Sequence, residues 1–269
     1  MFSDTDAVRI ISTDGVHVYG VTSVDDELFV LLERDDNQVA VYSIDDYQLL
    51  RHLHLPGLGG HHFNDITSCV RLKRLYISDY HNNCIHRFDL SSSAVSKWSV
   101  DDTPCGLSVT PSGNLLVTSR GPPNKLIELS ADSGQCVREV TLQSDITAPH
   151  HAIQLTTGQL VICHGFWDDL HRVCVVNDKG TGATCSYGGQ CGSDVGHLNY
   201  PCHLAVDEDS QFIFVANEDN NRVVLLSPTL EFVRDFSNEL SGPCRLYFHH
   251  STRRLYIGQL GGYVTVIQL

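Results

Sequence analysis

The sequence has no apolar run long enough to cross a membrane, since none approaches the roughly 20 residues that a bilayer requires. Its first residues lack the basic and apolar stretches of a signal peptide, so we expect a cytoplasmic protein without a membrane partner. Basic residues are also scarce, because 18 Lys and Arg face 32 Asp and Glu and give a formal net charge of −14. Nucleic-acid binding depends on Lys and Arg that neutralise phosphates. The charge balance therefore argues against a nucleic-acid partner.

The ten cysteines lack the paired spacing of a zinc finger or a disulfide framework. They are scattered singly, and several lie in apolar runs such as 161–163 and 173–175, where cysteine is typically a small buried hydrophobic residue. With no secretion signal, a reducing compartment is the better expectation. Only Cys185 and Cys191, which flank a Tyr-Gly-Gly turn, are placed for a local disulfide. Whether they pair stays open.

The chain also lacks any sustained apolar period of 3.6 residues, which excludes a large helical content. What it has instead is a short apolar run that recurs six times, anchored on Leu28, Leu75, Leu115, Leu160, Ile213 and Leu255. The intervals between these anchors are 47, 40, 45, 53 and 42 residues. Each anchor has an apolar segment before it and another after it, and a more polar run such as 232–236 closes most copies. Each copy therefore predicts four strands.

Six units of four strands predict an all-β protein, a six-bladed β-propeller with four-stranded antiparallel blades. The sixth copy ends at Leu269 after its third strand, whereas segment 7–11 is a strand that belongs to no copy. We therefore expect the N-terminal strand to complete the last blade and close the ring. Residues 1–269 then form a single domain, which we expect to be a monomer.

The fifth copy carries the most specific motif. Tyr200–Asp207 reads Tyr-Pro-Cys-His-Leu-Ala-Val-Asp and is followed by Ile213–Asn217 and Asn220–Val224, a pattern that resembles the NHL repeat. The second copy is similar, with Leu75–Asp79 and His81–Asn83. The resemblance covers the whole chain and implies an NHL-type propeller. Propellers of this kind host unrelated functions, so the fold alone implies no activity.

The resemblance points to two classes of function. The NHL domains of tripartite-motif ubiquitin ligases bind RNA or protein, although this chain has no RING or B-box cysteine and histidine pattern. More distantly similar propellers include the zinc-dependent peptidyl-hydroxyglycine amidating lyase and the gluconolactonase and paraoxonase hydrolases.

Aligning the first strands of the copies predicts two levels of residues around a central channel. One level holds Gly20, Asp65, Gly106, His151, His203 and Arg245, and the level before it holds Tyr19, Asn64, Cys105, His150, Cys202 and Cys244. Imidazole and carboxylate groups are the usual ligands of zinc, and the amidating lyase holds its zinc with three channel histidines.

The resemblance therefore makes His151, His203 and Asp65 candidate ligands for zinc or another divalent metal, with Asn64, His150 and Arg245 as further channel candidates. The third histidine is missing here. The alternative is that Asp65 pairs with Arg245 while the histidines hydrogen-bond to backbone or water. A Cys–His pair at the level of His150 is a third possibility.

The loops after the second strands predict an acidic face. One of them places Phe166 and Trp167 beside Asp168 and Asp169, and exposed aromatic residues flanked by acids are typical interface anchors. The alternative is that Trp167 packs back over a blade edge. Matching loops contribute the other candidates for this binding face, Arg120, Glu218 and Asp219.

Two hypotheses follow for function. The first is a non-catalytic protein-recognition module that presents its acidic loop face and channel mouth to a protein or peptide partner of basic character. The alternative is a metal-dependent lyase or lactone/ester hydrolase with a His/Asp site in the channel. No Gly-x-Ser-x-Gly nucleophile motif is present, and no residue is assigned a catalytic role.

Overall fold

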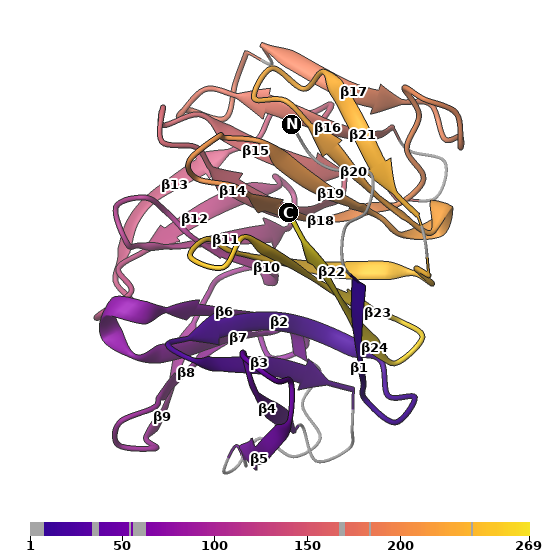
Figure 1. The fold of residues 1–269 in the computed structure, drawn as a ribbon. Coiled ribbons are helices and arrows are strands. Elements are labelled where there is room, and N and C mark those ends of the chain that lie inside the picture. The colour runs from indigo at the N-terminus through magenta and orange to yellow at the C-terminus, as the bar shows by residue number, and fades with distance from the viewer. Residues whose placement is uncertain are drawn as a thin grey trace.

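The computed structural model describes residues 8–33, 38–53, 55, 63–166, 170–182, 184–237 and 239–269. Over these residues the chain forms six four-stranded antiparallel sheets, which are arranged as blades around a central axis (Figure 1). The six-bladed all-β propeller that the repeat predicts is therefore confirmed.

In each blade the first strand is innermost. From inside to outside, the first blade consists of β2 (Val18–Val24), β3 (Glu27–Leu32), β4 (Val39–Ser43) and β5 (Leu49–Leu53). The second consists of β6 (Phe63–Cys69), β7 (Arg74–Asp79), β8 (Cys84–Asp89) and β9 (Val95–Ser99). The third consists of β10 (Thr103–Val109), β11 (Leu115–Arg120), β12 (Lys125–Leu129) and β13 (Cys136–Thr141). The next two are β14 (Pro149–Gln154), β15 (Leu160–His164), β16 (His171–Val176) and β17 (Cys185–Gly189), and then β18 (Pro201–Val206), β19 (Ile213–Asn217), β20 (Arg222–Leu226) and β21 (Phe232–Phe236).

The last blade joins the two ends of the chain. It contains β22 (Pro243–His249), β23 (Arg254–Gln259) and β24 (Tyr263–Gln268), with β1 (Val8–Ser12) as its outer strand. β1 pairs antiparallel with β24 from Val8 opposite Ile267 to Ser12 opposite Tyr263. Figure 1 shows this indigo strand beside the yellow C-terminal strands. The predicted closure of the ring by the N-terminal strand is therefore confirmed.

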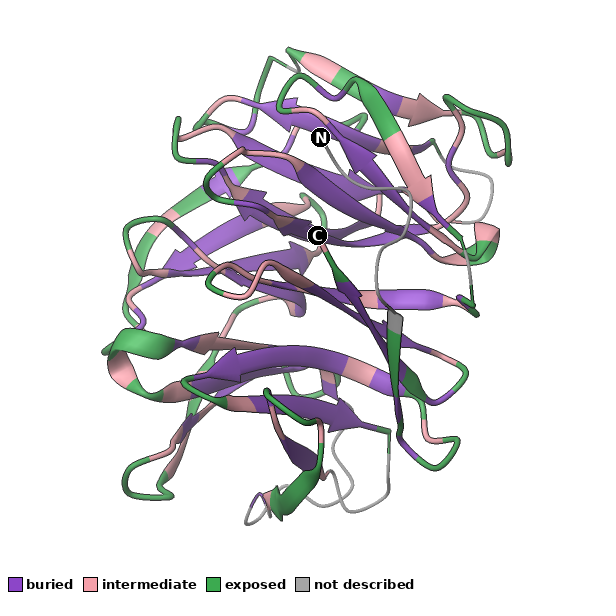
Figure 2. Ribbon diagram, viewed as in Figure 1, coloured by how far each residue is buried: buried purple, intermediate pink, exposed green. Residues whose placement is uncertain are grey.

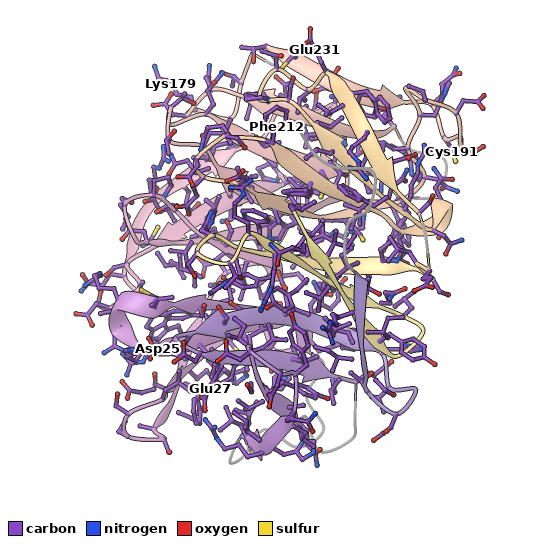
Figure 3. All side chains as sticks on the ribbon, in the orientation of Figure 1. Asp25, Glu27, Lys179, Cys191, Phe212 and Glu231 are labelled. Carbon is purple, nitrogen blue, oxygen red and sulfur yellow. The ribbon has the colours of Figure 1, made fainter. Side chains whose placement is uncertain are left out.

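Helix is confined to two single 3₁₀ turns in the described chain, η1 (Val70–Leu72) and η2 (Glu218–Asn220). Neither is long and apolar enough to cross a membrane. The described cysteines are all free thiols, including Cys185 and Cys191, so the local disulfide is not formed. Cys191 is exposed and lies at the right-hand edge of the view in Figure 3.

The hydrophobic core lies in the seams between blades. Each of the six clusters of buried residues combines side chains from two neighbouring blades, and the innermost strands contact one another around the full ring. Strands that pack on both faces read as continuous apolar runs, which explains the periodic signal in the sequence. Figure 2 shows the inner strands buried and several outer strands exposed.

Ile10 and Ile11 on β1 provide a matched test of ring closure. Ile11 is 5% exposed in the seam between the last and first blades, whereas Ile10 is 51% exposed on the other side of the same strand. We expect Ile11→Ala to lower the free energy of unfolding by about 2–4 kcal/mol and Ile10→Ala to change it by less than about 0.5 kcal/mol. Equal effects in urea unfolding would contradict the closing role of β1.

Candidate functional site

A β-bulge at the start of every innermost strand directs side chains toward the axis. The pairing register shifts between Val18 and Gly20, Phe63 and Asp65, Pro104 and Leu107, Pro149 and His151, Pro201 and His203, and Pro243 and Arg245. A bulge sets two residues opposite one and changes where their side chains point. The two levels that the sequence alignment proposed coincide with these six bulges.

Asp65 belongs to the level that also holds His151, His203 and Arg245, and its carboxylate is fully buried. Its Oδ1 accepts the N–H of Ile66 at 2.9 Å, and its Oδ2 accepts the N–H of Leu107 from the next blade at 2.8 Å. The Arg245 Nε is 3.9 Å from Oδ1. Burial by itself would raise the pKa of Asp65, but His203, Arg245 and His151 outweigh burial and hold the pKa below its usual value.

Arg245 connects three blades across the channel. It donates from Nε to the carbonyl of Tyr19 at 2.9 Å and from its two terminal nitrogens to the carbonyls of Cys244 and Asn64, both at 2.6 Å. Together with the approach to Asp65, these bonds satisfy a guanidinium that is otherwise surrounded by protein. The predicted alternative, in which Asp65 and Arg245 face each other across the channel, matches this geometry.

His151 and His203 stack on each other, with ring centroids 3.8 Å apart. His151 Nε2 donates to the carbonyl of Leu107 at 3.0 Å. His203 Nδ1 accepts the N–H of Leu246 at 3.3 Å, so its proton lies on Nε2, which is 3.4 Å from Asp65 Oδ2. Burial first, and then the neighbouring His203, lowers the pKa of His151 to about 3. Both rings are therefore placed as hydrogen-bond donors toward oxygen.

The ligand atoms of Asp65, His151 and His203 lie within 4.8 Å of one another, close enough to share a metal ion. His151 Nε2, however, donates to the backbone carbonyl of Leu107, which is not one of the three predicted ligands. A metal ion binds the lone pair of an unprotonated imidazole nitrogen, so it would have to break this bond to the backbone. The zinc site stays a prediction that this hydrogen bonding does not favour. We name the group Asp65, His151, His203 and Arg245 the channel belt.

Gly106 belongs to the same level and makes room for the belt. A Cβ at this position would lie 2.6 Å from the carbonyl oxygen of His150 and 2.7 Å from the ring of His151. Only glycine fits this close approach between the third and fourth blades.

A polar pocket of about 220 Å³ opens above the belt at the loop face, and we call it the mouth pocket. Besides channel residues it is lined by Tyr80, Arg120, Tyr200, Glu218 and Leu260. All of these except Tyr200 lie five residues after the apolar residue that anchors their repeat, as Tyr80 does after Leu75. Aligning the second strands, as well as the first, would have shown this third level. The pattern of the first strands gives no signal for Tyr80, Tyr200 or Leu260 as site residues.

Arg120 and His150 form one wall of the mouth pocket. Arg120 donates from Nε to the carbonyl of Pro149 at 3.0 Å and from a terminal nitrogen to His150 Nδ1. His150 Nε2 donates to the carbonyl of Gly165 at 3.0 Å. Burial, followed by the charge of Arg120, lowers the pKa of His150 to about 3, so its ring is neutral. Arg120 therefore lies at the channel mouth, bonded to the same His150 ring that contacts Phe166.

The other binding-face candidates divide into three groups. Glu218 lines the mouth pocket, where burial raises its pKa above the ordinary value, and its neighbour Asp219 is exposed. Phe166 packs against Tyr200 and His150, with ring centroids 5.5 and 6.2 Å apart. The remaining candidates, Trp167, Asp168 and Asp169, lie outside the described residues.

The thiols at the level of His150 are not paired with it. Cys202 and Cys244 donate to backbone carbonyls, and Cys105 Sγ lies 3.9 Å from the carbonyl of Thr103. Burial raises the pKa of each of the three. Protonated thiols are poor nucleophiles, so the Cys–His alternative does not match the geometry.

The buried rings of His150 and His151 predict that the folded protein loses stability in acid. Their pKa values are about 3 in the folded protein, and an unfolded chain titrates near 6.5. As the pH falls from about 6.5 toward 3, the unfolded chain binds protons that the folded protein does not. The free energy of unfolding should then drop by up to about 1.4 kcal/mol per pH unit for each histidine.

Urea unfolding between about pH 7 and pH 4 measures this slope. We expect His151→Asn to make the slope shallower and His52→Gln, at an exposed position on β5, to leave it unchanged. An unchanged slope in His151→Asn would contradict the assignment of a buried neutral ring.

Comparison with known proteins gives the fold and little more. No protein-family model and no curated protein sequence matches the chain. Among solved structures, a protein provisionally assigned as a gluconolactonase aligns with a TM-score of 0.74 and 16% identity, over 99% of this chain and 93% of the other. A catalytically inactive virginiamycin B lyase from Staphylococcus aureus, solved with quinupristin, aligns with a TM-score of 0.69 and 10% identity, over 98% of this chain and 100% of the other. At these identities the similarity shows the six-bladed propeller fold alone, and the NHL repeat itself stays a prediction.

Proposed function

We propose that this protein is a recognition module that binds a basic segment of a partner protein at its loop face, with one side chain entering the mouth pocket. The pocket volume of about 220 Å³ supports this, because small-molecule sites usually measure roughly 300–1,000 Å³. A pocket of this size suits a single side chain. The belt residues at its base are already hydrogen-bonded within the protein.

The observation that carries the proposal is that Glu218 lines a pocket to which three tyrosines also contribute. Within the described part of the chain Glu218 forms no salt bridge, whereas Arg245 faces Asp65 and Arg120 is held by His150 and Pro149. Tyr19, Tyr80 and Tyr200 line the same pocket. A carboxylate and aromatic rings that line one pocket can bind an ammonium or guanidinium group through ion pairing and cation–π attraction.

The rim of the pocket supports the same kind of partner. Glu33, Asp101 and Asp219 are exposed on loops of this face, and the whole chain has a formal net charge of −14. Acidic surroundings attract basic segments and speed their association, most strongly at low salt. Phe166 beside Tyr200 adds apolar contact area next to the pocket.

A library of short peptides immobilised on a surface tests the proposal directly. We expect wild-type protein to select peptides that contain Lys or Arg, and Glu218→Gln to bind them at least tenfold more weakly, which corresponds to about 1.4 kcal/mol. Glu208→Gln is the matched control, because Glu208 is exposed at the opposite end of the channel. Selection that ignores basic residues, or equal loss in both variants, would refute the proposal.

A second candidate is a lyase or a lactone/ester hydrolase, and the observation that favours it is the raised pKa of Glu218 inside a pocket. A carboxyl group with a raised pKa can exchange protons with a substrate near neutral pH. The neighbours of known or assigned enzymatic activity share the fold with this chain. In this second candidate function, Glu218 is the proton-exchanging group and the belt holds no metal ion.

Assays on a panel of simple lactones and esters separate the two candidates. If the protein is an enzyme of this kind, Glu218→Gln should lower turnover at least about a hundredfold. Activity should rise with pH through the raised pKa of Glu218 if its carboxylate acts as the base. Absence of turnover together with selective peptide binding would leave the recognition module as the function.

A further inference from the structure

A second cluster of metal-ligating side chains lies outside the mouth pocket, on the hairpin of the second blade. Asp79 ends β7 and Cys84 begins β8, and the two residues pair across the strands. His86 follows on the same side of β8, two residues after Cys84. The three side chains are fully buried or nearly so, and their ligand atoms all lie within 4.8 Å of one another.

His86 Nε2 lies close to the ligand atoms of both other residues. His86 Nε2 is 3.0 Å from Asp79 Oδ2 and 3.4 Å from Cys84 Sγ. A tetrahedral zinc ion with bonds of about 2.0 Å to nitrogen and oxygen and about 2.3 Å to sulfur separates its ligand atoms by about 3.3 to 3.6 Å. The two separations from His86 Nε2 require only small shifts to reach that geometry, and the third ligand distance lies below 4.8 Å.

The same contacts exclude a Cys–His–Asp relay. In such a relay the thiol contacts one ring nitrogen and the carboxylate contacts the other. Here a single atom, His86 Nε2, contacts both groups. Burial, followed by the charge of Asp79, raises the pKa of Cys84 to about 11, so the thiol is not an activated nucleophile.

The carboxylate of Asp79 is already oriented by the turn that follows it. Asn82 donates its backbone N–H to Oδ1 at 3.1 Å and its side-chain amide to both oxygens at 3.0 Å. Outer partners that fix a ligating carboxylate are a regular feature of metal sites. All three ligands and this partner lie between residues 79 and 86, so one short hairpin brings them together.

We propose that Asp79, Cys84 and His86 form a structural site for a thiolate-binding divalent transition metal, with zinc as the expected ion. Sulfur and imidazole ligands select such ions over calcium and magnesium, which prefer oxygen. The three residues supply three positions of a tetrahedral shell, and a small donor such as water completes it. Binding releases the Cys84 proton and fixes the turn that carries Tyr80, a lining residue of the mouth pocket.

The site has one competing cation within the blade. Lys97 on β9 pairs with His86 across the strands, and its positive charge lowers the pKa of Cys84 against the larger effects of burial and Asp79. The same positive charge would oppose a metal ion at this position. A metal ion would displace it, so Lys97→Met should strengthen metal binding.

Cobalt(II) titration of chelator-treated full-length protein tests the site. We expect one equivalent of Co²⁺ to bind and to give the near-ultraviolet charge-transfer band of a cobalt–thiolate bond. Cys84→Ser should abolish the band, and Asn82→Ala should weaken binding about tenfold. The matched control Cys174→Ser removes another buried thiol, on β16, and should retain the band.

Two further measurements keep the result decisive. Zn²⁺ should protect Cys84 of the wild-type protein from alkylation in mild denaturant, a readout that does not depend on whether a variant folds. The double variant His151→Gln/His203→Gln should keep the cobalt band, because the belt lies elsewhere. No thiolate band in wild type, a band that persists in Cys84→Ser, or a band that disappears in the belt variant would each overturn the proposal.

Discussion

The buried carboxylate of Asp65 is the group on which the centre of this propeller depends. An uncompensated charge in the interior costs several kcal/mol, so its neighbours must supply hydrogen bonds and opposite charge. They do so from several blades, with the N–H groups of Ile66 and Leu107, the Nε2 of His203 and the guanidinium of Arg245. Apolar seams hold neighbouring blades together, whereas this polar belt joins blades across the axis.

The belt also determines what the loop face can do. The belt's ionic and imidazole groups bond to one another and to backbone carbonyls, so their hydrogen-bonding capacity is largely used within the protein. The groups that remain for a ligand stand above the belt, at the ends of the second strands. Glu218, Arg120 and Tyr80 come from three different blades, so their spacing depends on the closed ring and not on any one hairpin.

The two histidine clusters illustrate how local geometry changes chemistry. In the belt, the backbone N–H of Leu246 fixes the tautomer of His203 and leaves Nε2 as a donor to Asp65. On the β7–β8 hairpin, one nitrogen of His86 faces a thiol and a carboxylate together. The belt differs because His151 Nε2 is bonded to a backbone carbonyl, whereas the ligand atoms of the hairpin face one another and form the set that we propose for a metal ion.

The sequence by itself determined the propeller. Strands that are buried on both faces leave an apolar run in every repeat, and these runs can be read from the sequence without any knowledge of tertiary contacts. It also placed Asp65, His151, His203 and Arg245 at one level, since repeats share a register. Only the tertiary structure decided their chemistry: bulges turned the side chains inward, and backbone groups of neighbouring blades took up their hydrogen bonds. Tyr80 and Glu218 became pocket residues for the same reason, because proximity across a ring is set by closure and not by separation along the chain.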